Sequence, residues 1–315
     1  MKRHMTSIGR RRFLGLCASL ASAASAVSFY ASAQPRGSLT RVIPATGERI
    51  HAVGMGSWIT FNVGNDPAER AIRVEILDKF FSHGGAMIDS SPMYGKSEEV
   101  IGYCLKRLKN TQTLFSATKV WMLGRRFGIS QMKHSEDLWG PNGFDLMQIH
   151  NLVDWEAHIE TLKAWKSEGR IRYIGMTTSH GRRHDELLEV MNRVPLDFVQ
   201  FTYNILDREA EAHLLPVAAE NGIAVIINRP FRRGRLFDYV RDKALPEWAS
   251  EFDCANWAQF FLKFILSHPN VTCAIPATSQ VVHMEENMGA AYGRLPDAET
   301  RLRMLGYFDS LVQSS

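Results

Sequence analysis

The chain has 315 residues, of which 45% are hydrophobic and 22% charged, and its formal net charge is +4. This composition excludes collagen-like and intrinsically disordered chains, and the length suits one large domain with an extensive core. Residues 1–33 hold five Lys or Arg side chains and no acid, so removing their charge from +4 leaves −1 for the remainder. A near-neutral body gives no electrostatic reason to expect nucleic acid or a membrane surface as a partner.

Residues 1–33 have the features of a targeting segment. Arg10-Arg11-Arg12-Phe13-Leu14 precedes a short Ala-rich apolar run, and Ala31-Ser32-Ala33 forms a small-residue cleavage site before Gln34. The run is too short for an ordinary spanning helix, and we expect no stable membrane anchor after its removal. The arginine string resembles a twin-arginine signal, which implies the twin-arginine translocation machinery as a partner and export of the folded, cofactor-loaded protein to a bacterial periplasm. The alternatives are an amphipathic N-terminal helix on a cytoplasmic protein, and lipoprotein processing at Cys17, which no apolar run precedes.

The cysteines do not form a disulfide framework. Cys17 lies in the targeting segment, and Cys104, Cys254 and Cys273 are an odd number without a C-x-x-C pair. We expect free buried thiols, as in a protein that folds in a reducing compartment.

From residue 34 to residue 315, short apolar runs alternate with helical patterns. A β-hairpin is predicted first, over Arg41–His51, with its turn at Thr46-Gly47. Eight strands are predicted after it, near Ala52–Gly56, Ala86–Asp89, Leu114–Lys119, Leu146–His150, Ile171–Thr177, Phe198–Tyr203, Ala224–Asn228 and Cys273–Pro276. Between the strands, Asp66-Pro67 and Ser97 are typical helix starts, and Asn221-Gly222 is a typical helix end.

Eight βα units in one series predict an α/β fold, a single-domain (β/α)₈ TIM barrel over residues 34–315, with the hairpin plugging its bottom. The alternative is an open doubly wound sheet, which usually carries a G-x-G-x-x-G turn after its first strand. Here Gly54-Met55-Gly56 continues into Ser57-Trp58-Ile59, so that fingerprint is absent. The stretch from Pro230 to Asp253 has no clear pattern, and we expect a functional loop there.

Titratable side chains stand at three consecutive strand ends. Asp89 ends the second strand and Tyr94 follows it by five residues, Lys119 ends the third strand, and His150 ends the fourth. In a barrel the carboxyl ends of the strands form the active-site mouth, so these four side chains are expected to converge.

Together the four residues are suited to general acid catalysis, in which a side chain donates a proton to the substrate. A phenol is a poor proton donor near neutral pH, and an adjacent ammonium is expected to lower its pKa. Tyr94 would then donate a proton to a developing alkoxide, with Lys119 beside it and Asp89 holding the lysine. His150 would orient the carbonyl oxygen.

The set and its spacing resemble the Asp–Tyr–Lys–His tetrad of the aldo/keto reductases. The resemblance runs from about Arg41 to Ala291. Its first specific motif is the stretch from Asp89 to Gly102, which ends in PMYGKSEEVIG, and the others are KVW, QIHN, IRYIGMT, VQFTYN and IPATS…EEN. The resemblance implies reduction of a small-molecule aldehyde or ketone with a nicotinamide cofactor that lies across the barrel mouth.

The resemblance also implies cofactor contacts. Thr177, Thr178 and Gln200 correspond to residues that bind the nicotinamide amide, and Asn228 replaces an aromatic that normally stacks on the ring. On the last strand, Ala277 and His283 replace the basic residues that contact the 2′-phosphate in many members. The remaining adenine-side and phosphate-side positions are Thr278, Ser279, Gln280, Glu286 and Asn287. An arginine cluster that includes Arg229 and Arg233 follows the seventh strand and suits a clamp over the pyrophosphate. On balance NADP(H) is expected rather than NAD(H).

Trp58, Trp121 and Tyr203 follow strand ends and are expected to wall an open substrate pocket. The alternative function is a non-catalytic nicotinamide-nucleotide-binding sensor or partner subunit on the same fold. A barrel hydrolase is disfavoured, because no second acid stands at the strand tips, and no H-x-H or H-E-x-x-H spacing points to a metal.

Overall fold

The computed structural model describes residues 37–139 and 143–313. The predicted targeting segment, residues 1–33, lies outside them. The described chain opens with an antiparallel hairpin of β1 (Thr40–Val42) and β2 (Arg49–His51), as predicted. Gly47 in its turn has φ +78°, a conformation that glycine adopts without strain.

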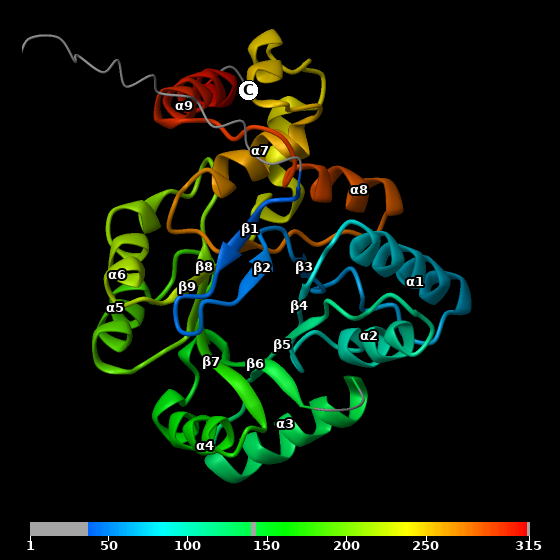
Figure 1. The fold of residues 1–315 in the computed structure, drawn as a ribbon, viewed down its shortest axis with the longest axis vertical. Coiled ribbons are helices and arrows are strands. Elements are labelled where there is room, and N and C mark those ends of the chain that lie inside the picture. The colour runs from blue at the N-terminus through cyan, green and yellow to red at the C-terminus, as the bar shows by residue number, and fades with distance from the viewer. Residues whose placement is uncertain (1–36, 140–142, 314–315) are drawn as a thin grey trace, which may run out of the picture. The chain divides into compact units, whose positions relative to one another are not determined.

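Eight parallel strands follow and form one sheet in sequential order, from β3 to β10. Their bounds are β3 (Met55–Gly56), β4 (Met87–Asp89), β5 (Phe115–Val120), β6 (Phe144–Ile149), β7 (Ile171–Thr177), β8 (Phe198–Thr202), β9 (Ala224–Asn228) and β10 (Cys273–Ala274). A parallel bridge between Val53 and Ala274 brings the first and last strands together. The predicted barrel is therefore confirmed, and the open doubly wound sheet is wrong (Figure 1).

The helices cover the outside of the barrel (Figure 1). They are α1 (Pro67–Ser82), α2 (Ser97–Leu105), α3 (Arg125–Trp139), α4 (Trp155–Ser167), α5 (His184–Arg193), α6 (Leu214–Glu220), α7 (Trp257–Leu266), α8 (Val281–Gly289) and α9 (Ala298–Gln313). The Asp66 carboxylate accepts the backbone N–H groups of Ala68 and Glu69, so the predicted N-cap is confirmed. Helix α6 ends directly before Asn221 and Gly222, as expected. None of the described helices is long and apolar enough to cross a membrane.

The hairpin plugs the amino-terminal end of the barrel. Ile43 and Ile50 are buried in the same cluster as residues of the strands that face the barrel interior, among them Phe115 and Phe198. The Tyr173 hydroxyl lies 2.8 Å from the Thr46 hydroxyl and 2.7 Å from a Glu48 carboxylate oxygen, which ties the hairpin to β7. The hairpin thus fills the end opposite the predicted active site.

The stretch from Pro230 to Asp253 folds into two 3₁₀ segments, η3 (Arg232–Val240) and η4 (Glu247–Phe252). Arg229, Arg232 and Arg233 have positive φ values of 52°, 50° and 61°. Such conformations cost free energy in non-glycine residues, and they cluster at functional sites. The described cysteines, Cys104, Cys254 and Cys273, are free and buried.

Candidate active site

A buried ion pair lies at the base of the barrel mouth. The Lys119 ammonium donates to Asp89 Oδ2 at 2.6 Å and to the Ser90 carbonyl at 2.7 Å, and its side chain is inaccessible to solvent. Asp89 Oδ1 accepts N–H groups from Gln148 and Gln200, each at 2.9 Å. Burial lowers the pKa of Lys119, and the Asp89 carboxylate opposes this effect. Hydrogen bonds to both Asp89 oxygens and from the Lys119 ammonium therefore hold the pair in one defined geometry.

Tyr94 and His150 lie above this pair. The Lys119 ammonium is 5.3 Å from the centroid of the Tyr94 ring, and the His150 ring meets Tyr94 edge-on with centroids 5.8 Å apart. His150 Nδ1 lies 2.9 Å from the Ser91 hydroxyl, which leaves Nε2 for a substrate oxygen. The four residues predicted to converge are brought together.

The titration of these groups differs in part from expectation. The sequence predicted that the Lys119 ammonium would lower the pKa of Tyr94. In the structure burial, and then the Asp89 carboxylate, raise that pKa well above its usual value. Desolvation of the phenolate is the largest cause of this shift. Burial, and then Lys119, lower the pKa of His150 to about 3, so the imidazole is neutral near pH 7.

A large cavity of about 1260 Å³ opens at the carboxyl ends of the strands. It exceeds the ~300–1,000 Å³ of an ordinary small-molecule pocket. Among its lining residues are most of those predicted from the sequence: Trp58, Asp89, Tyr94, His150, Thr177, Thr178, Gln200, Asn228, Arg229, Arg233, Thr278, Glu286 and Asn287.

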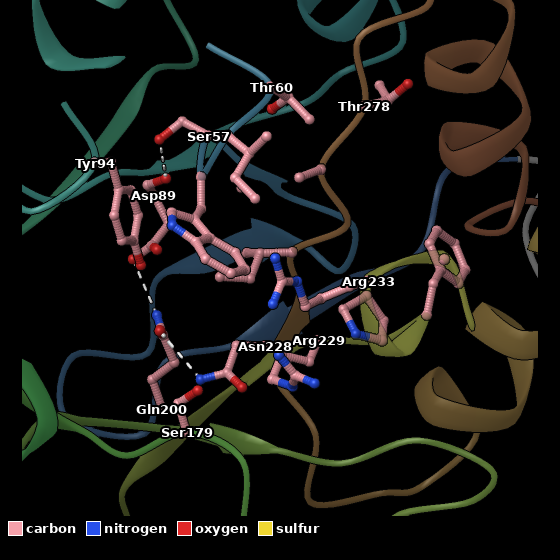
Figure 2. Close-up of a pocket in the computed structure, with 18 of the residues that line it drawn as sticks. Ser57, Thr60, Asp89, Tyr94, Ser179, Gln200, Asn228, Arg229, Arg233 and Thr278 are labelled. Atoms are coloured by element: carbon pink, nitrogen blue, oxygen red, sulfur yellow. Dashed lines mark hydrogen bonds between the residues drawn. The ribbon is translucent and has the colours of Figure 1, made fainter. Parts of the chain in front are cut away.

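The amide-rich floor of the cavity is held by internal hydrogen bonds. Asn228 donates to the Thr178 carbonyl at 2.9 Å and accepts from the Thr202 hydroxyl at 2.7 Å, and Figure 2 shows it beside Gln200. The Thr177 hydroxyl accepts the Asn151 N–H at 3.0 Å. The buried Thr178 hydroxyl has no hydrogen-bond partner in the described structure, although it borders the cavity. Such an orphan is expected where a polar ligand belongs.

Two arginines project into the cavity without a carboxylate partner among the described residues (Figure 2). Arg229 donates to His180 Nε2 at 2.7 Å, and its own Nε lies buried without a partner. Arg233 lies over the Trp58 ring at 4.4 Å, so the loops after β3 and β9 meet across the mouth. Uncompensated guanidinium groups of this kind suit phosphate oxygens.

Four residues that were predicted to border the cavity do not line it. Tyr203 does not wall the pocket: it is fully buried between the barrel and α7, where its hydroxyl contacts Glu211 and Arg301. Gln200 and Thr202 point inward, so the next residue, Tyr203, points outward by the alternation of a strand. Trp121, Ser279 and Gln280 do not line the cavity. Trp121 is exposed on the surface, and the Gln280 backbone N–H donates to the Thr278 hydroxyl.

Sequence reasoning missed several supporting residues. Gln148 and Ser91 hold Asp89 and His150, and His180 holds Arg229. Gln148 could have been predicted from the sequence, because it precedes His150 by two residues in the predicted strand Leu146–His150, and side chains two residues apart share a strand face. The partnership of His180 with Arg229 carries no sequence signal, because it joins loops after two different strands.

The residues present fit a nicotinamide dinucleotide in two respects. The cavity is large enough for a ligand longer than one small molecule, and it is lined by two unpaired guanidinium groups and an orphaned hydroxyl. In one respect the fit is incomplete: Asn228 cannot stack on an aromatic ring as a tyrosine would.

An eight-stranded parallel barrel with a lysine–aspartate pair under a tyrosine and a neutral histidine defines a barrel oxidoreductase. Comparison with known proteins gives the family. Residues 52–302 match the model of the Aldo/keto reductase family. The chain belongs to the aldo/keto reductase family of NAD(P)H-dependent oxidoreductases.

Relatives and solved structures agree with this. The chain is 28% identical over 310 residues to the NADH-specific methylglyoxal reductase of Escherichia coli, covering 79% of this chain and 92% of that protein. It is 27% identical over 209 residues to the aldo-keto reductase YhdN of Bacillus subtilis, covering 62% of each. An aldo-keto reductase from Klebsiella pneumoniae in complex with NADPH has the same fold, with a TM-score of 0.71 at 22% identity over 87% of this chain and 95% of that one. The thermostable aldo-keto reductase Tm1743 gives a TM-score of 0.69 at 28% identity, covering 87% and 99%.

Proposed function

We propose that this protein reduces an aldehyde or ketone to an alcohol, with Tyr94 as the proton donor. The observation that carries the proposal is the buried Lys119–Asp89 pair, 2.6 Å long, whose ammonium lies 5.3 Å from the Tyr94 ring at the base of the cavity. A lysine so fully buried is costly to keep unless its position serves a purpose.

Each residue has a distinct role in the proposal. Tyr94 holds its proton at neutral pH and gives it to the carbonyl oxygen as negative charge develops there. The Lys119 ammonium stabilises the phenolate that remains, and Asp89 with its two glutamine donors fixes the ammonium. Neutral His150 orients the carbonyl oxygen through Nε2. Bound cofactor supplies the hydride; Thr177, Thr178, Gln200 and Asn228 would hold its nicotinamide end.

The test is Tyr94→Phe, which removes only the hydroxyl. Carbonyl reduction should fall by about 10²–10⁴ in kcat, while cofactor affinity stays close to that of the wild type. Tyr103→Phe, the same change on α2 outside the cavity, is the control and should leave kcat unchanged. If Tyr94→Phe keeps more than about a tenth of the wild-type kcat, Tyr94 is not the acid.

The alternative function is a nicotinamide-nucleotide sensor or partner subunit without turnover. The hydrogen-bonded amide of Asn228, where an aromatic ring would stack, is the observation that favours it. Tight cofactor binding with no turnover of any generic aldehyde by the wild-type protein would support this alternative and contradict the reductase proposal.

We propose NADP(H) as the preferred cofactor. Arg229 and Arg233 supply unpaired positive charge for its phosphates, and Thr278 and His283 line the cavity near the end of β10 for the 2′-phosphate, with Glu286 and Asn287 on the adenine side. Ala277 is neutral where many members have lysine, and the Escherichia coli relative is named NADH-specific.

We expect NADPH to bind more tightly than NADH in a fluorescence titration, because the 2′-phosphate adds charge that these groups can bond. Equal dissociation constants would contradict the 2′-phosphate assignment.

The proposed location is the periplasm, reached through the twin-arginine translocation machinery and then without a membrane anchor. Support comes from Arg10–Arg12 and Ala31-Ser32-Ala33 in the sequence. Since nicotinamide cofactors are made in the cytoplasm, export requires tight cofactor binding before transport. Arg229 and Arg233 closing over the pyrophosphate would provide it.

A further inference from the structure

One surface segment beside the active site is exposed over seven consecutive residues, 121–127, with the sequence WMLGRRF. Four of its side chains are large and apolar, and two of these are mostly exposed, Leu123 at 71% and Phe127 at 66%. Trp121 and Met122 are also exposed. Isolated exposed apolar residues are ordinary on soluble proteins, but a run of them marks an interaction site. We call residues 121–127, which comprise the connection after β5 and the first residues of α3, the WMLGRRF loop.

The WMLGRRF loop is held in place by side chains of α3 and α4 and by Asp154. Gln131 accepts the Trp121 N–H at 2.7 Å and donates to the Trp121 carbonyl at 3.1 Å. The Met122 carbonyl lies 2.7 Å from His158 Nε2, and Asp154 accepts the Gly124 N–H at 2.6 Å. Three side chains thus satisfy the backbone of the loop, and the apolar side chains point outward from a fixed frame.

The charge of the loop is positive. Arg125 and Arg126 form no ion pair within the described residues; Arg125 donates instead to the Thr161 hydroxyl at 2.9 Å. Asp154 is the acid that contacts the loop, and its Oδ2 accepts a backbone N–H there. Aromatic and aliphatic side chains combined with arginines are the composition that binds at the surface of an anionic bilayer.

We propose that the WMLGRRF loop docks the protein on an anionic phospholipid membrane. The loop does not line the catalytic cavity, which argues against a substrate-binding role for its side chains. It begins two residues after Lys119, so docking would place the barrel mouth beside the lipid surface. The net charge of −1 over the body does not oppose this, because attraction to a surface depends on the charges within about one Debye length of it. The proposal stands or falls independently of the reductase chemistry.

The experiment is sedimentation of the full chain with vesicles of phosphatidylglycerol and phosphatidylethanolamine, compared with vesicles of phosphatidylcholine. We expect binding to the anionic vesicles that weakens as salt is added. The pair Leu123→Ser and Phe127→Ser should weaken it by roughly tenfold or more, since two apolar side chains lose their burial in lipid. Arg125→Gln with Arg126→Gln should weaken it by about fivefold or more and flatten the salt dependence.

The matched control is Leu302→Ser on α9, because Leu302 is exposed to the same degree, 69%, but lies outside the loop. Its binding should equal that of the wild type. All variants share residues 1–33, so any vesicle affinity of that segment cancels in the comparison. Circular dichroism checks that each variant folds.

Several results would overturn the proposal. They are no vesicle binding by the wild type, equal binding by the loop variants and the wild type, and equal loss in Leu302→Ser. A further one is a dimer of the wild type that the loop variants abolish without any effect on vesicle binding, since the loop would then be an interface between copies of the chain.

Discussion

At the scale of single residues, burial controls the chemistry of the site more than the neighbouring charges do. Desolvation of the phenolate, and then the Asp89 carboxylate, raise the pKa of Tyr94, although the Lys119 ammonium lies 5.3 Å from its ring. The result suits a reductase, because a general acid must hold its proton until the alkoxide forms. His150 follows the same rule with the opposite sign, since burial favours the neutral imidazole.

These shifts predict a flat pH profile for carbonyl reduction. Between about pH 5 and pH 8 Tyr94 stays protonated, because its pKa lies well above its usual value, and His150 stays neutral, because its pKa is about 3. We expect kcat at saturating cofactor to be constant over this range. A break near pH 6.5, the ordinary value for histidine, would show that the imidazole titrates in turnover and would contradict the assignment.

At the scale of elements, the hairpin contributes to the stability of the barrel, whereas the carboxyl ends of the strands carry its active site. The hairpin closes the amino-terminal end through Ile43 and Ile50, and the chemistry lies at the carboxyl ends of β4, β5 and β6. Such a separation lets stability and activity respond to different substitutions.

Ile43→Ala tests this division. The side chain is fully buried, so its truncation should leave a cavity and lower the free energy of unfolding by about 2–5 kcal/mol, with kcat unchanged. Denaturant unfolding and steady-state kinetics measure the two quantities. Val42→Ala, on the exposed neighbour in β1, is the control and should cost less than about 1 kcal/mol. A large loss of kcat in Ile43→Ala would show that the hairpin also shapes the active site.

At the scale of the whole molecule, the fold of the barrel and the proposed cellular location of the protein depend on different parts of the chain. The chain from Leu39 onward forms the barrel and its hairpin, whereas the proposed export depends on Arg10–Arg12 and on Ala31-Ser32-Ala33. Charge is also distributed unevenly over the surface, because the WMLGRRF loop is positive while the net charge of residues 34–315 is near zero.

Replacing Arg10, Arg11 and Arg12 by Lys tests the export proposal. Lysine keeps the positive charge, so general electrostatic effects persist, but twin-arginine recognition should be lost and the protein should remain in the cytoplasm. Cell fractionation with an assay of bound nucleotide measures the outcome. Wild-type protein found only in the cytoplasm, with residues 1–33 attached, would reject export.

The sequence by itself determined the barrel and the strand-end positions of Asp89, Lys119 and His150. Apolar runs of strand length alternate with helical patterns, and parallel strands place their carboxyl ends at one mouth whatever the side-chain details are. Tertiary structure decided what depends on packing between distant segments. It turned Tyr203 away from the cavity, so that its hydroxyl contacts Glu211 and Arg301. It paired Arg229 with His180 and Arg233 with Trp58 across the mouth, and it surrounded Tyr94 with atoms that desolvate the phenolate and raise its pKa. Desolvation arises from the surrounding atoms in three dimensions, and no local pattern in the chain encodes it.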